Sequence, residues 1–173
     1  RIGYIPQKAT LFSGTIKSNL RYADENATNS TIENALEVSQ AKEFVSKMPS
    51  GIEEAISQGG TNVSGGQKQR LSIARALVKN ADIYIFDDTF SALDYHTDAL
   101  LREALNKMVK EKHSTVFIVA QRISSIMHAD KIIVLDQGKI VGNGTHDELM
   151  QNCPIYQEIA YSQLSRKELA VNE

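Results

Sequence analysis

The residues best suited to chemistry in this 173-residue chain begin at Ser64, which can cap a helix and is followed by Gly65 and Gly66. An amphipathic run then continues to Val78, so the pattern predicts a helix that starts on two glycines. Glycines at a helix start leave backbone N–H groups uncovered, and the helix dipole adds partial positive charge there. The stretch therefore predicts an anion site, with phosphate the usual anion, although a turn that merely starts a helix is an equally open interpretation. The predicted apolar face consists of Leu71, Ala74, Leu77 and Val78.

A pair of carboxylates follows a short apolar run further along the chain. Residues 82–86 are typical of a buried strand, and Asp87 and Asp88 close it. A carboxylate at the C-terminal end of such a strand lies where α/β proteins place ligand chemistry. A Ser-Ala-Leu-Asp turn, which ends at Asp94, comes next.

Together, the Ser-Gly-Gly-Gln helix, the strand that ends in two acids and the Ser-Ala-Leu-Asp turn closely resemble the ATP-binding cassette (ABC) ATPases. The resemblance covers nearly the whole chain, from Gln7 to about Tyr156. It implies an α/β fold with part of a P-loop NTPase-type sheet and an inserted helical signature subdomain. It also implies ATP and Mg²⁺ as cofactors. Residues 12–20 are close in sequence to the exporter type, in which this region faces the membrane domains.

The resemblance implies roles for individual residues. Asp87 matches the Mg²⁺-linked Asp that ends the Walker B strand. Gln7 matches the Q-loop Gln, which contacts Mg²⁺ and the attacking water, and Asp94 matches the D-loop Asp at the seam of a head-to-tail dimer. The signature residues, which in the family bind the γ-phosphate of the nucleotide held by a second ABC half, are Ser64, Gly65, Gly66 and Gln67.

Two positions that would serve the chain's own nucleotide depart from the family pattern. Asp88 stands where most members have Glu as general base or water-positioner, and its carboxylate is withdrawn by about 1.5 Å, one C–C bond. A misplacement of about 1 Å can cost on the order of 10²-fold in rate. Gln121 stands where the family has His, and an amide can neither become cationic nor shuttle a proton. Beside an intact signature, both departures resemble the half of a heterodimeric multidrug exporter that contributes the degenerate site.

No Gly-x-x-x-x-Gly-Lys-Ser/Thr motif occurs in the chain. The family order places this P-loop upstream of Arg1, so we interpret the sequence as the C-terminal portion of an ABC domain. We expect the portion alone to bind ATP weakly or not at all and to be inactive. The expected divisions of residues 1–173 are 8–79 for the helical signature subdomain, 80–146 for the C-terminal part of the RecA-like core, and 147–173 for the C-terminal helices and tail.

Apolar runs place the strands. Ile2–Ile5 is expected to be a strand, and residues 115–120 are a continuous β-branched and apolar run, which favours a buried parallel strand. Residues 132–135 and 139–141 flank an Asp-Gln-Gly turn, which predicts a hairpin.

Periodicity and capping residues place the helices. Ser30 and Glu33 are interpreted as a capping box that starts a helix ending near Ser39. Further helices are expected at 41–47 and 97–111, from Thr145, and from Pro154 through Leu164 before a polar tail. The helix at 97–111 is predicted to bury Leu100, Leu101, Ala104, Leu105 and Met108.

Composition narrows the class of protein. The net charge is −2 with both signs mixed along the chain, so a nucleic-acid partner is not indicated. The single cysteine, Cys153, excludes an internal disulfide and fits a reducing compartment. No apolar run approaches the roughly 18 residues of a membrane span. The four histidines have no metal-ligand spacing among them.

The resemblance therefore predicts the ATP-binding and ATP-hydrolysing domain of an ABC exporter, at the cytoplasmic face of the cell membrane. Its predicted partners are transmembrane domains and an unlike second ABC half. One alternative is a regulatory cassette that binds ATP and hydrolyses little, which Asp88 and Gln121 keep open. The other is a soluble ABC ATPase of DNA repair or translation. Such proteins usually carry coiled-coil insertions or tandem cassettes, and neither is visible in the sequence.

Overall fold

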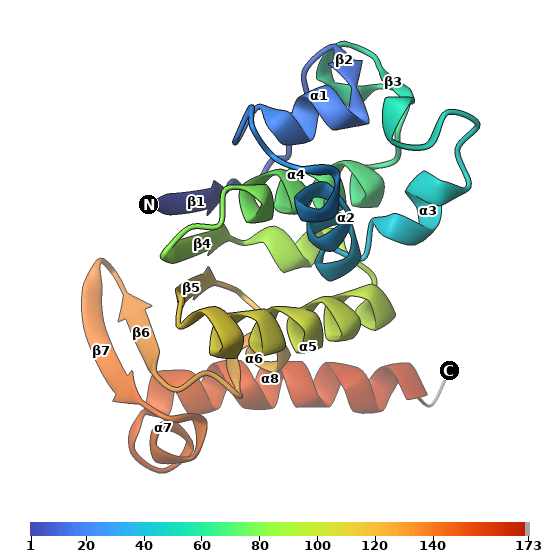
Figure 1. Cartoon of the computed structure of the whole chain (residues 1–173). Coiled ribbons are helices and arrows are strands. Elements are labelled where there is room, and N and C mark those ends of the chain that lie inside the picture. Colours follow the sequence, from blue (N-terminus) through green and yellow to red (C-terminus); the bar gives the residue numbers. More distant parts are fainter. Residues whose placement is uncertain (172–173) are drawn as a thin grey trace. The chain divides into compact units, whose positions relative to one another are not determined.

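Three apolar runs form a parallel sheet of β1 (Ile2–Ile5), β4 (Ile83–Asp87) and β5 (Thr115–Val119), with β4 in the centre (Figure 1). The computed structural model describes the backbone of residues 1–171 and the side chains of residues 1–163. The sheet belongs to one compact unit, Arg1–Val119, and Ala120–Glu173 forms a second. The parallel pairing, together with the helices of the same unit, confirms the predicted α/β class.

The two faces of this sheet differ in burial, because side chains alternate along a strand. On one face, Tyr84 and Phe86 of β4 are completely buried. On the other face, Tyr4 of β1 and Phe117 of β5 are each more than half exposed. The prediction of a buried strand at 115–120 was therefore wrong in part. The strand is parallel as expected, but it lies at an edge of the described sheet and one of its faces is uncovered.

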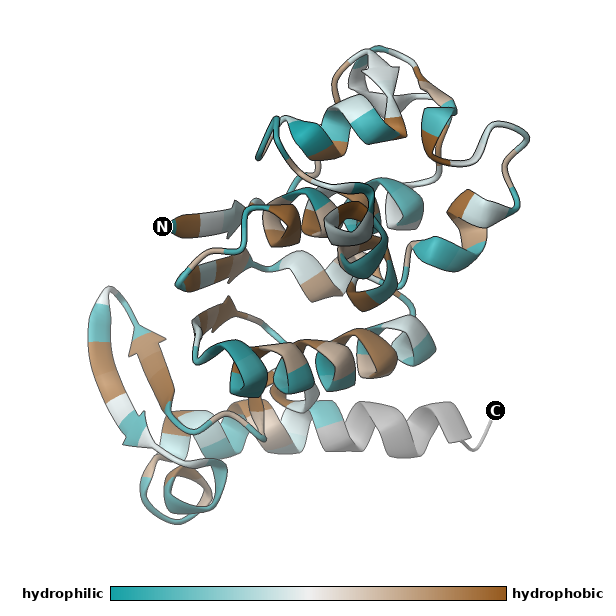
Figure 2. Cartoon of the chain, in the orientation of Figure 1, coloured by the Kyte–Doolittle hydropathy of each residue, from teal (hydrophilic) through white to brown (hydrophobic). Residues whose placement is uncertain are grey.

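Helix α4 (Gly65–Val78) packs against β1 and against two further helices, α1 (Ile16–Arg21) and α2 (Asn29–Val38). Figure 2 shows hydrophobic segments on α4, β1 and β4, which supply this core. Burial of a whole Leu or Val side chain contributes about 1.5–3 kcal/mol, so the apolar face of α4 is a major stabilising surface. The predicted composition of that face is confirmed by the burial of Leu71, Ala74, Leu77 and Val78.

The first unit contains further elements, most of them short. The two-residue strands β2 and β3 pair antiparallel, and the short helix expected at 41–47 is present as α3. The remaining bounds in this unit are β2 Gly14–Thr15, α3 Lys42–Ser46, β3 Ala55–Ile56, α5 Tyr95–Lys112, and 3₁₀ turns at Gly51–Glu53, Gln58–Gly60 and Thr89–Ala92.

The start of α2 differs from its prediction. Thr28, not Ser30, is the N-cap, and its hydroxyl accepts a hydrogen bond from the backbone N–H of Thr31 at 3.1 Å. Asn29 is already helical, so Ser30 lies inside the first turn and is exposed. The end of the helix agrees with the prediction, because Ser39 is the C-cap.

The start of α5 also differs, because the helix begins at Tyr95 rather than at Thr97. Asp94 is its N-cap and accepts from the backbone N–H of Thr97 at 2.9 Å. Leu101, Leu105 and Met108 are buried as predicted. Leu100 is 39% exposed and Ala104 is only half-buried, so two of the five predicted core positions were wrong.

The second unit has its own small core. The predicted hairpin is confirmed, and the helix expected from Thr145 is present, with Thr145 as its N-cap in a capping box with Glu148. Helix α8 runs to Val171 rather than ending at Leu164, and the expected tail lies outside the described side chains. The elements are α6 Ile123–Ile126, β6 Ile132–Asp136, β7 Lys139–Gly144, α7 His146–Asn152 and α8 Pro154–Val171. The core consists of Ile132, Val134, Leu149, Cys153 and Tyr156.

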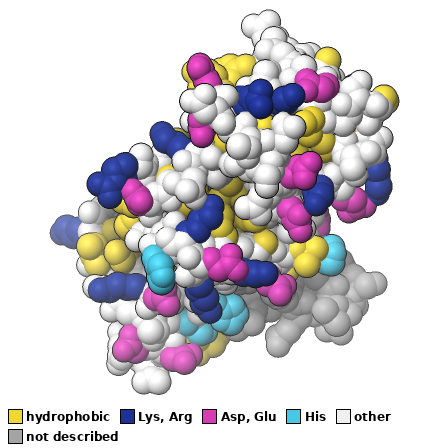
Figure 3. Space-filling view, viewed as in Figure 1, with side chains coloured by type: hydrophobic (Ala, Val, Ile, Leu, Met, Phe, Trp, Pro, Cys, Tyr) yellow, Lys and Arg dark blue, Asp and Glu magenta, His cyan; other side chains and the backbone are white. Residues whose placement is uncertain are grey.

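None of the helices in the described part of the chain is long and apolar enough to span a membrane. On the face seen in Figure 3, Lys and Arg side chains are interspersed with Asp and Glu rather than gathered by sign. This distribution agrees with a net charge of −2 and gives that face no broad basic surface.

Candidate functional site

Three of the predicted site residues meet where β1 and β4 end. Because the two strands are parallel neighbours, their C-terminal ends lie at the same edge of the sheet. Gln7 follows β1, and its Nε2 donates a hydrogen bond to Oδ2 of Asp88 at 3.1 Å. Asp87 is the last residue of β4, directly before Asp88. The structure thus brings together the side-chain amide of Gln7 and the carboxylate of Asp88, with Asp87 next to them in the chain.

Asp88 adopts a left-handed backbone conformation, with φ 43° and ψ 32°. This region is disfavoured for residues with a Cβ, but Asp tolerates it better than most. Its backbone N–H donates to the carbonyl of Val119 at 3.0 Å, and its own carbonyl accepts from the Ser91 hydroxyl at 2.8 Å. The turn is therefore fixed on both sides, and it is this fixed turn that directs the Asp88 carboxylate toward Gln7.

Asp87 is held by a residue that the sequence analysis did not select. The hydroxyl of Tyr4, on β1, donates to Oδ2 of Asp87 at 2.9 Å. The hydrogen bond to Asp87 is the main reason that the pKa of Tyr4 is raised above its ordinary value. The signal for this pair lies in strand register: Tyr4 is aligned with Ile85, two residues before Asp87 and on the same face of the sheet.

The signature residues form a reciprocal capping box at the start of α4. Ser64 Oγ accepts from the backbone N–H of Gln67 at 3.2 Å, and Gln67 Oε1 accepts from the backbone N–H of Ser64 at 3.0 Å. A Cβ placed on Gly65 would meet nothing within 4 Å, and one on Gly66 would meet only the carbonyl of Ala92 at 3.9 Å. The N–H of Gln67 is bound by Ser64, whereas a helix offers no backbone acceptor to the N–H groups of Gly65 and Gly66, so an anion can approach those two closely.

Asp94 acts within its own unit as a helix cap. Its Oδ1 accepts from the backbone N–H of Thr97 at 2.9 Å, and its Oδ2 accepts from the Thr97 hydroxyl at 2.7 Å. Hydrogen bonds from the Thr97 backbone and side chain hold the pKa of Asp94 below its usual value. The carboxylate is engaged in starting α5, and its assignment to a dimer seam stays a prediction.

Gln121 belongs to the second unit. Its backbone carbonyl accepts from Gln163 Nε2 at 2.7 Å, and Gln163 Oε1 accepts from the backbone N–H of Ile123 at 2.8 Å. Gln163 therefore fixes the chain where α6 begins. The predicted cooperation of Gln121 with Asp88 stays a prediction.

The residues at the strand ends suit a hard cation. Asp87, Asp88 and the amide oxygen of Gln7 are oxygen ligands, and Mg²⁺ in phosphate chemistry usually binds one or two carboxylates together with phosphate oxygens. Among the described residues, no group of three or more His, Cys, Asp or Glu side chains could hold a metal ion. This set of ligands therefore fits Mg²⁺ only if a nucleotide supplies further oxygens.

Two residues of α4, besides Tyr4, were missed. Gln69 is only 2% exposed, and its Nε2 lies 3.5 Å from the carbonyl of Pro6. Arg75 donates through Nη2 to the carbonyl of Thr10 at 2.9 Å. The sequence gives no direct signal for either contact, because a Gln or an Arg in an amphipathic helix is ordinarily a surface residue.

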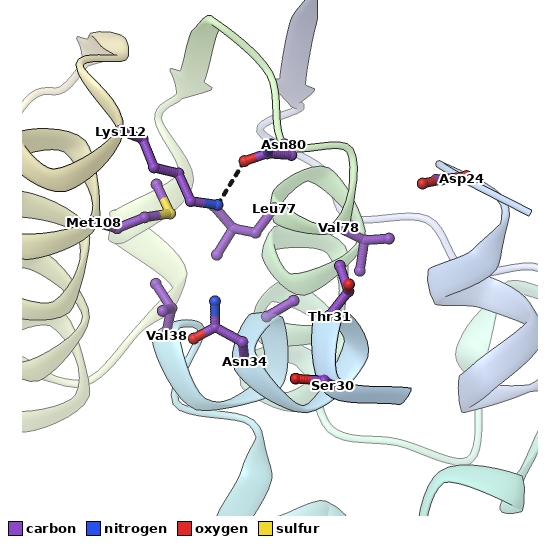
Figure 4. A pocket seen from close by; sticks show the side chains of 11 residues that line it. Asp24, Ser30, Thr31, Asn34, Val38, Leu77, Val78, Asn80, Met108 and Lys112 are labelled. Atoms are coloured by element: carbon purple, nitrogen blue, oxygen red, sulfur yellow. Dashed lines mark hydrogen bonds between the residues drawn. The ribbon is translucent and has the colours of Figure 1, made fainter. Parts of the chain in front are cut away.

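Two surface cavities of the first unit lie elsewhere. The larger, of about 610 Å³, is lined by α2, α4 and α5, and in it Lys112 Nζ donates to Asn80 Oδ1 at 2.6 Å (Figure 4). The smaller, of about 360 Å³, is lined by Arg70 and His96 among others. Neither is lined by Gln7, Asp87 or Asp88, so neither belongs to the strand-end site.

Comparison with known proteins gives concordant results. A family model described as ABC transporter matches residues 1–91. The chain is 48% identical to an uncharacterized ABC transporter ATP-binding protein of Mycobacterium tuberculosis, over 94% of this chain. It is 43% identical, over 96%, to another from Bacillus subtilis, and 40% identical, over 95%, to a putative export ATP-binding/permease protein of Rickettsia felis. It spans 28% of the length of each of these relatives.

A solved structure gives the same match at the level of the fold. A bacterial Atm1-family ABC exporter with ATP bound superposes with a TM-score of 0.89 at 34% identity, over 94% of this chain and 28% of that one. The predicted fold class is therefore confirmed.

Proposed function

Because the chain belongs to the ABC transporter family, we propose that it forms part of the ATP-binding domain of an exporter, in which ATP binding and hydrolysis drive a substrate across a membrane. The observation that carries the proposal is the contact between Gln7 and Asp88, next to Asp87, at the ends of two parallel strands. Relatives named as export ATP-binding/permease proteins support the direction of transport. The proposed location is the cytoplasmic face of the cell membrane, with transmembrane domains as partners.

The proposed chemistry is phosphoryl transfer from ATP to water, in which the protein supplies positioning and charge more than covalent help. Mg²⁺ would neutralise phosphate charge, and Asp87 and the side-chain oxygen of Gln7 would be its protein ligands. Gln7 holds the carboxylate of Asp88 through Nε2, which sets the direction in which that carboxylate can accept a proton. The glycine N–H groups after Ser64 would receive the γ-phosphate of the nucleotide that the facing half binds.

We further propose that the chain's own site is degenerate and that its signature completes the competent site of an unlike partner. Asp88 has a shorter side chain than the Glu that most family members have at this position. Its carboxylate is withdrawn by about 1.5 Å, one C–C bond, which leaves the attacking water poorly placed. Gln121 cannot carry the charge of the family's His. The signature, in contrast, forms a complete capping box with open space above Gly65. The divisions at residues 8–79, 80–146 and 147–173 remain part of this proposal.

The test uses the full-length protein with its partner. The double variant Asp88→Glu and Gln121→His is expected to raise single-site ATP turnover at the altered site by roughly 10²-fold. Turnover at each site is isolated by disabling the opposite site, and the control is the same pair of changes in a protein whose own site has lost its P-loop lysine. Two outcomes contradict the degenerate-site proposal. One is fast turnover at this chain's own site before Asp88 and Gln121 are changed, and the other is no gain in the double variant.

A regulatory cassette is the second candidate, and the same two residues favour it. In that case ATP binds and closes the dimer, but hydrolysis is negligible at both sites. Steady-state hydrolysis by the whole transporter separates the candidates, because an exporter turns over ATP at the partner's site. No feature of the described residues favours a soluble ATPase of DNA repair or translation.

A further inference from the structure

We propose that Arg75 and Gln69 of helix α4 are positioning residues that hold the loop of Gln7 in its working geometry. The inference rests on the proposed function for the role of Gln7 itself. We call the contacts of Arg75 and Gln69 with this loop the tether, and all of them lie within the first unit.

The loop in question is residues 6–13, which follow β1 and contain neither helix nor strand. It depends on its surroundings, because backbone groups outside regular structure need other partners. Two of its carbonyls receive donors from α4. Gln69 approaches the carbonyl of Pro6, directly before Gln7, and Arg75 binds the carbonyl of Thr10, three residues after Gln7. Gln7 therefore lies between two attachments to one helix.

The attachment at Thr10 is the stronger. The N···O distance is 2.9 Å, and the Arg75 guanidinium also lies over the ring of Phe12, 5.3 Å from its centroid. Arg75 is half-buried, and this burial lowers the pKa of its guanidinium from the usual value. A charged donor in such surroundings makes a stronger hydrogen bond than a neutral one. Leu11, between Thr10 and Phe12, is 1% exposed and anchors the loop from its apolar side.

The attachment at Pro6 is longer but more deeply buried. Gln69 is 2% exposed, so its amide has little access to water as an alternative partner. A buried polar side chain that loses its partner costs the free energy of desolvation. At 3.5 Å this contact is a weak hydrogen bond, and it contributes less than the contact of Arg75.

The tether links two parts of the proposed machinery. Helix α4 begins with the signature glycines, and its 14 residues form one continuous rod. A loop bound to that rod at two points moves with it. Under the proposed function, Gln7 serves the chain's own nucleotide while the signature serves the partner's nucleotide, so Arg75 and Gln69 connect one site with the other.

The experiment has two readouts in the full-length protein with its partner. In Arg75→Met, hydrogen exchange at the amides of residues 7–12 is expected to accelerate at least tenfold, and this readout does not depend on ATP turnover. In the background that carries Asp88→Glu and Gln121→His, kcat is expected to fall roughly 10- to 100-fold with KM for ATP changed less than threefold. Arg75→Lys keeps the charge but loses the planar fork, and is expected to lie between wild type and Arg75→Met.

The matched control is Lys79→Met, which removes a cation from the exposed C-terminal end of the same helix and is expected to change neither readout.

If Arg75→Met fails to fold, Gln69→Leu is the second variant. It removes the amide that contacts the Pro6 carbonyl and keeps a side chain of similar volume. Its expected result is faster exchange confined to residues 7–9. Unchanged exchange in both variants overturns the tether. Faster exchange with unchanged kcat overturns the positioning role. Absence of ATPase activity in every form counts against the proposed function, and the exchange result still decides the tether.

Discussion

At the scale of single residues, the site is built from pairs of side chains on adjacent strands. Tyr4 and Asp87 form one pair, and Gln7 and Asp88 form the next. A ligand carboxylate that is itself hydrogen-bonded keeps its orientation, and loss of such a supporting contact typically costs 10- to 100-fold in metal affinity, as an order of magnitude. Tyr4 therefore contributes to the proposed Mg²⁺ site without being a ligand.

The change Tyr4→Phe removes only the hydroxyl that supports Asp87. We expect it to weaken the affinity of the ATP-loaded full-length protein for Mn²⁺, used as a probe for Mg²⁺, by roughly tenfold. Electron paramagnetic resonance titration measures this affinity independently of hydrolysis. Tyr22→Phe is the control, because Tyr22 is strongly exposed and its ring contact with Phe12 survives the change. Equal Mn²⁺ affinity in both variants would show that Asp87 needs no support.

At the scale of elements, the sequence predicted where the helices and strands lie better than where they begin. Leu71, Ala74, Leu77 and Val78 recur at helical spacing and are all buried. Local choices were harder, because Thr28 and Ser30 are both good N-cap residues two positions apart. The structure selects Thr28, whose side chain accepts a hydrogen bond from the backbone N–H of Thr31, while Ser30 is already inside the helix.

This choice can be measured. Thr28→Ala is expected to lower the free energy of unfolding by about 1 kcal/mol, because it leaves the N–H of Thr31 without its partner. Ser30→Ala is the matched control and is expected to change it by less than about 0.5 kcal/mol. Urea unfolding of the two variants supplies the comparison. A larger loss for Ser30→Ala would restore the capping box that the sequence suggested.

At the scale of the molecule, one face of the parallel sheet is the main departure from expectation. Parallel sheets are normally covered on both faces, yet Tyr4 and Phe117 are more than half exposed. The sequence could not reveal this, because Thr115–Val119 has the composition of a fully buried strand whichever neighbour covers it. The contacts of Gln69 and Arg75 could not be predicted from the sequence either, since they join residues more than sixty positions apart.

Under the proposed function, we therefore expect a further layer of the ATP-binding domain, the one that would hold the P-loop, to cover this face. Phe117→Ala is expected to change the stability of the 173-residue chain little. In a chain extended to include the P-loop, the same change is expected to cost about 3–5 kcal/mol. An apolar dye that binds the exposed face of the sheet should bind less to the extended chain, because the added layer covers that face. Equal costs of Phe117→Ala in both chains, measured by urea unfolding, contradict this expectation.

The capping box at the start of α4 also bears on how the proposed nucleotide would be bound. Ser64 and Gln67 already satisfy each other's backbone groups before any ligand arrives. A phosphate can accept the O–H of Ser64 while the Ser64 oxygen keeps its hydrogen bond from Gln67, because a hydroxyl both donates and accepts. The capping box therefore stays formed whether or not a phosphate is bound. Under the proposed function, the helix start is already ordered before the two halves meet, so opening and closing of the dimer interface leaves this end of α4 unchanged.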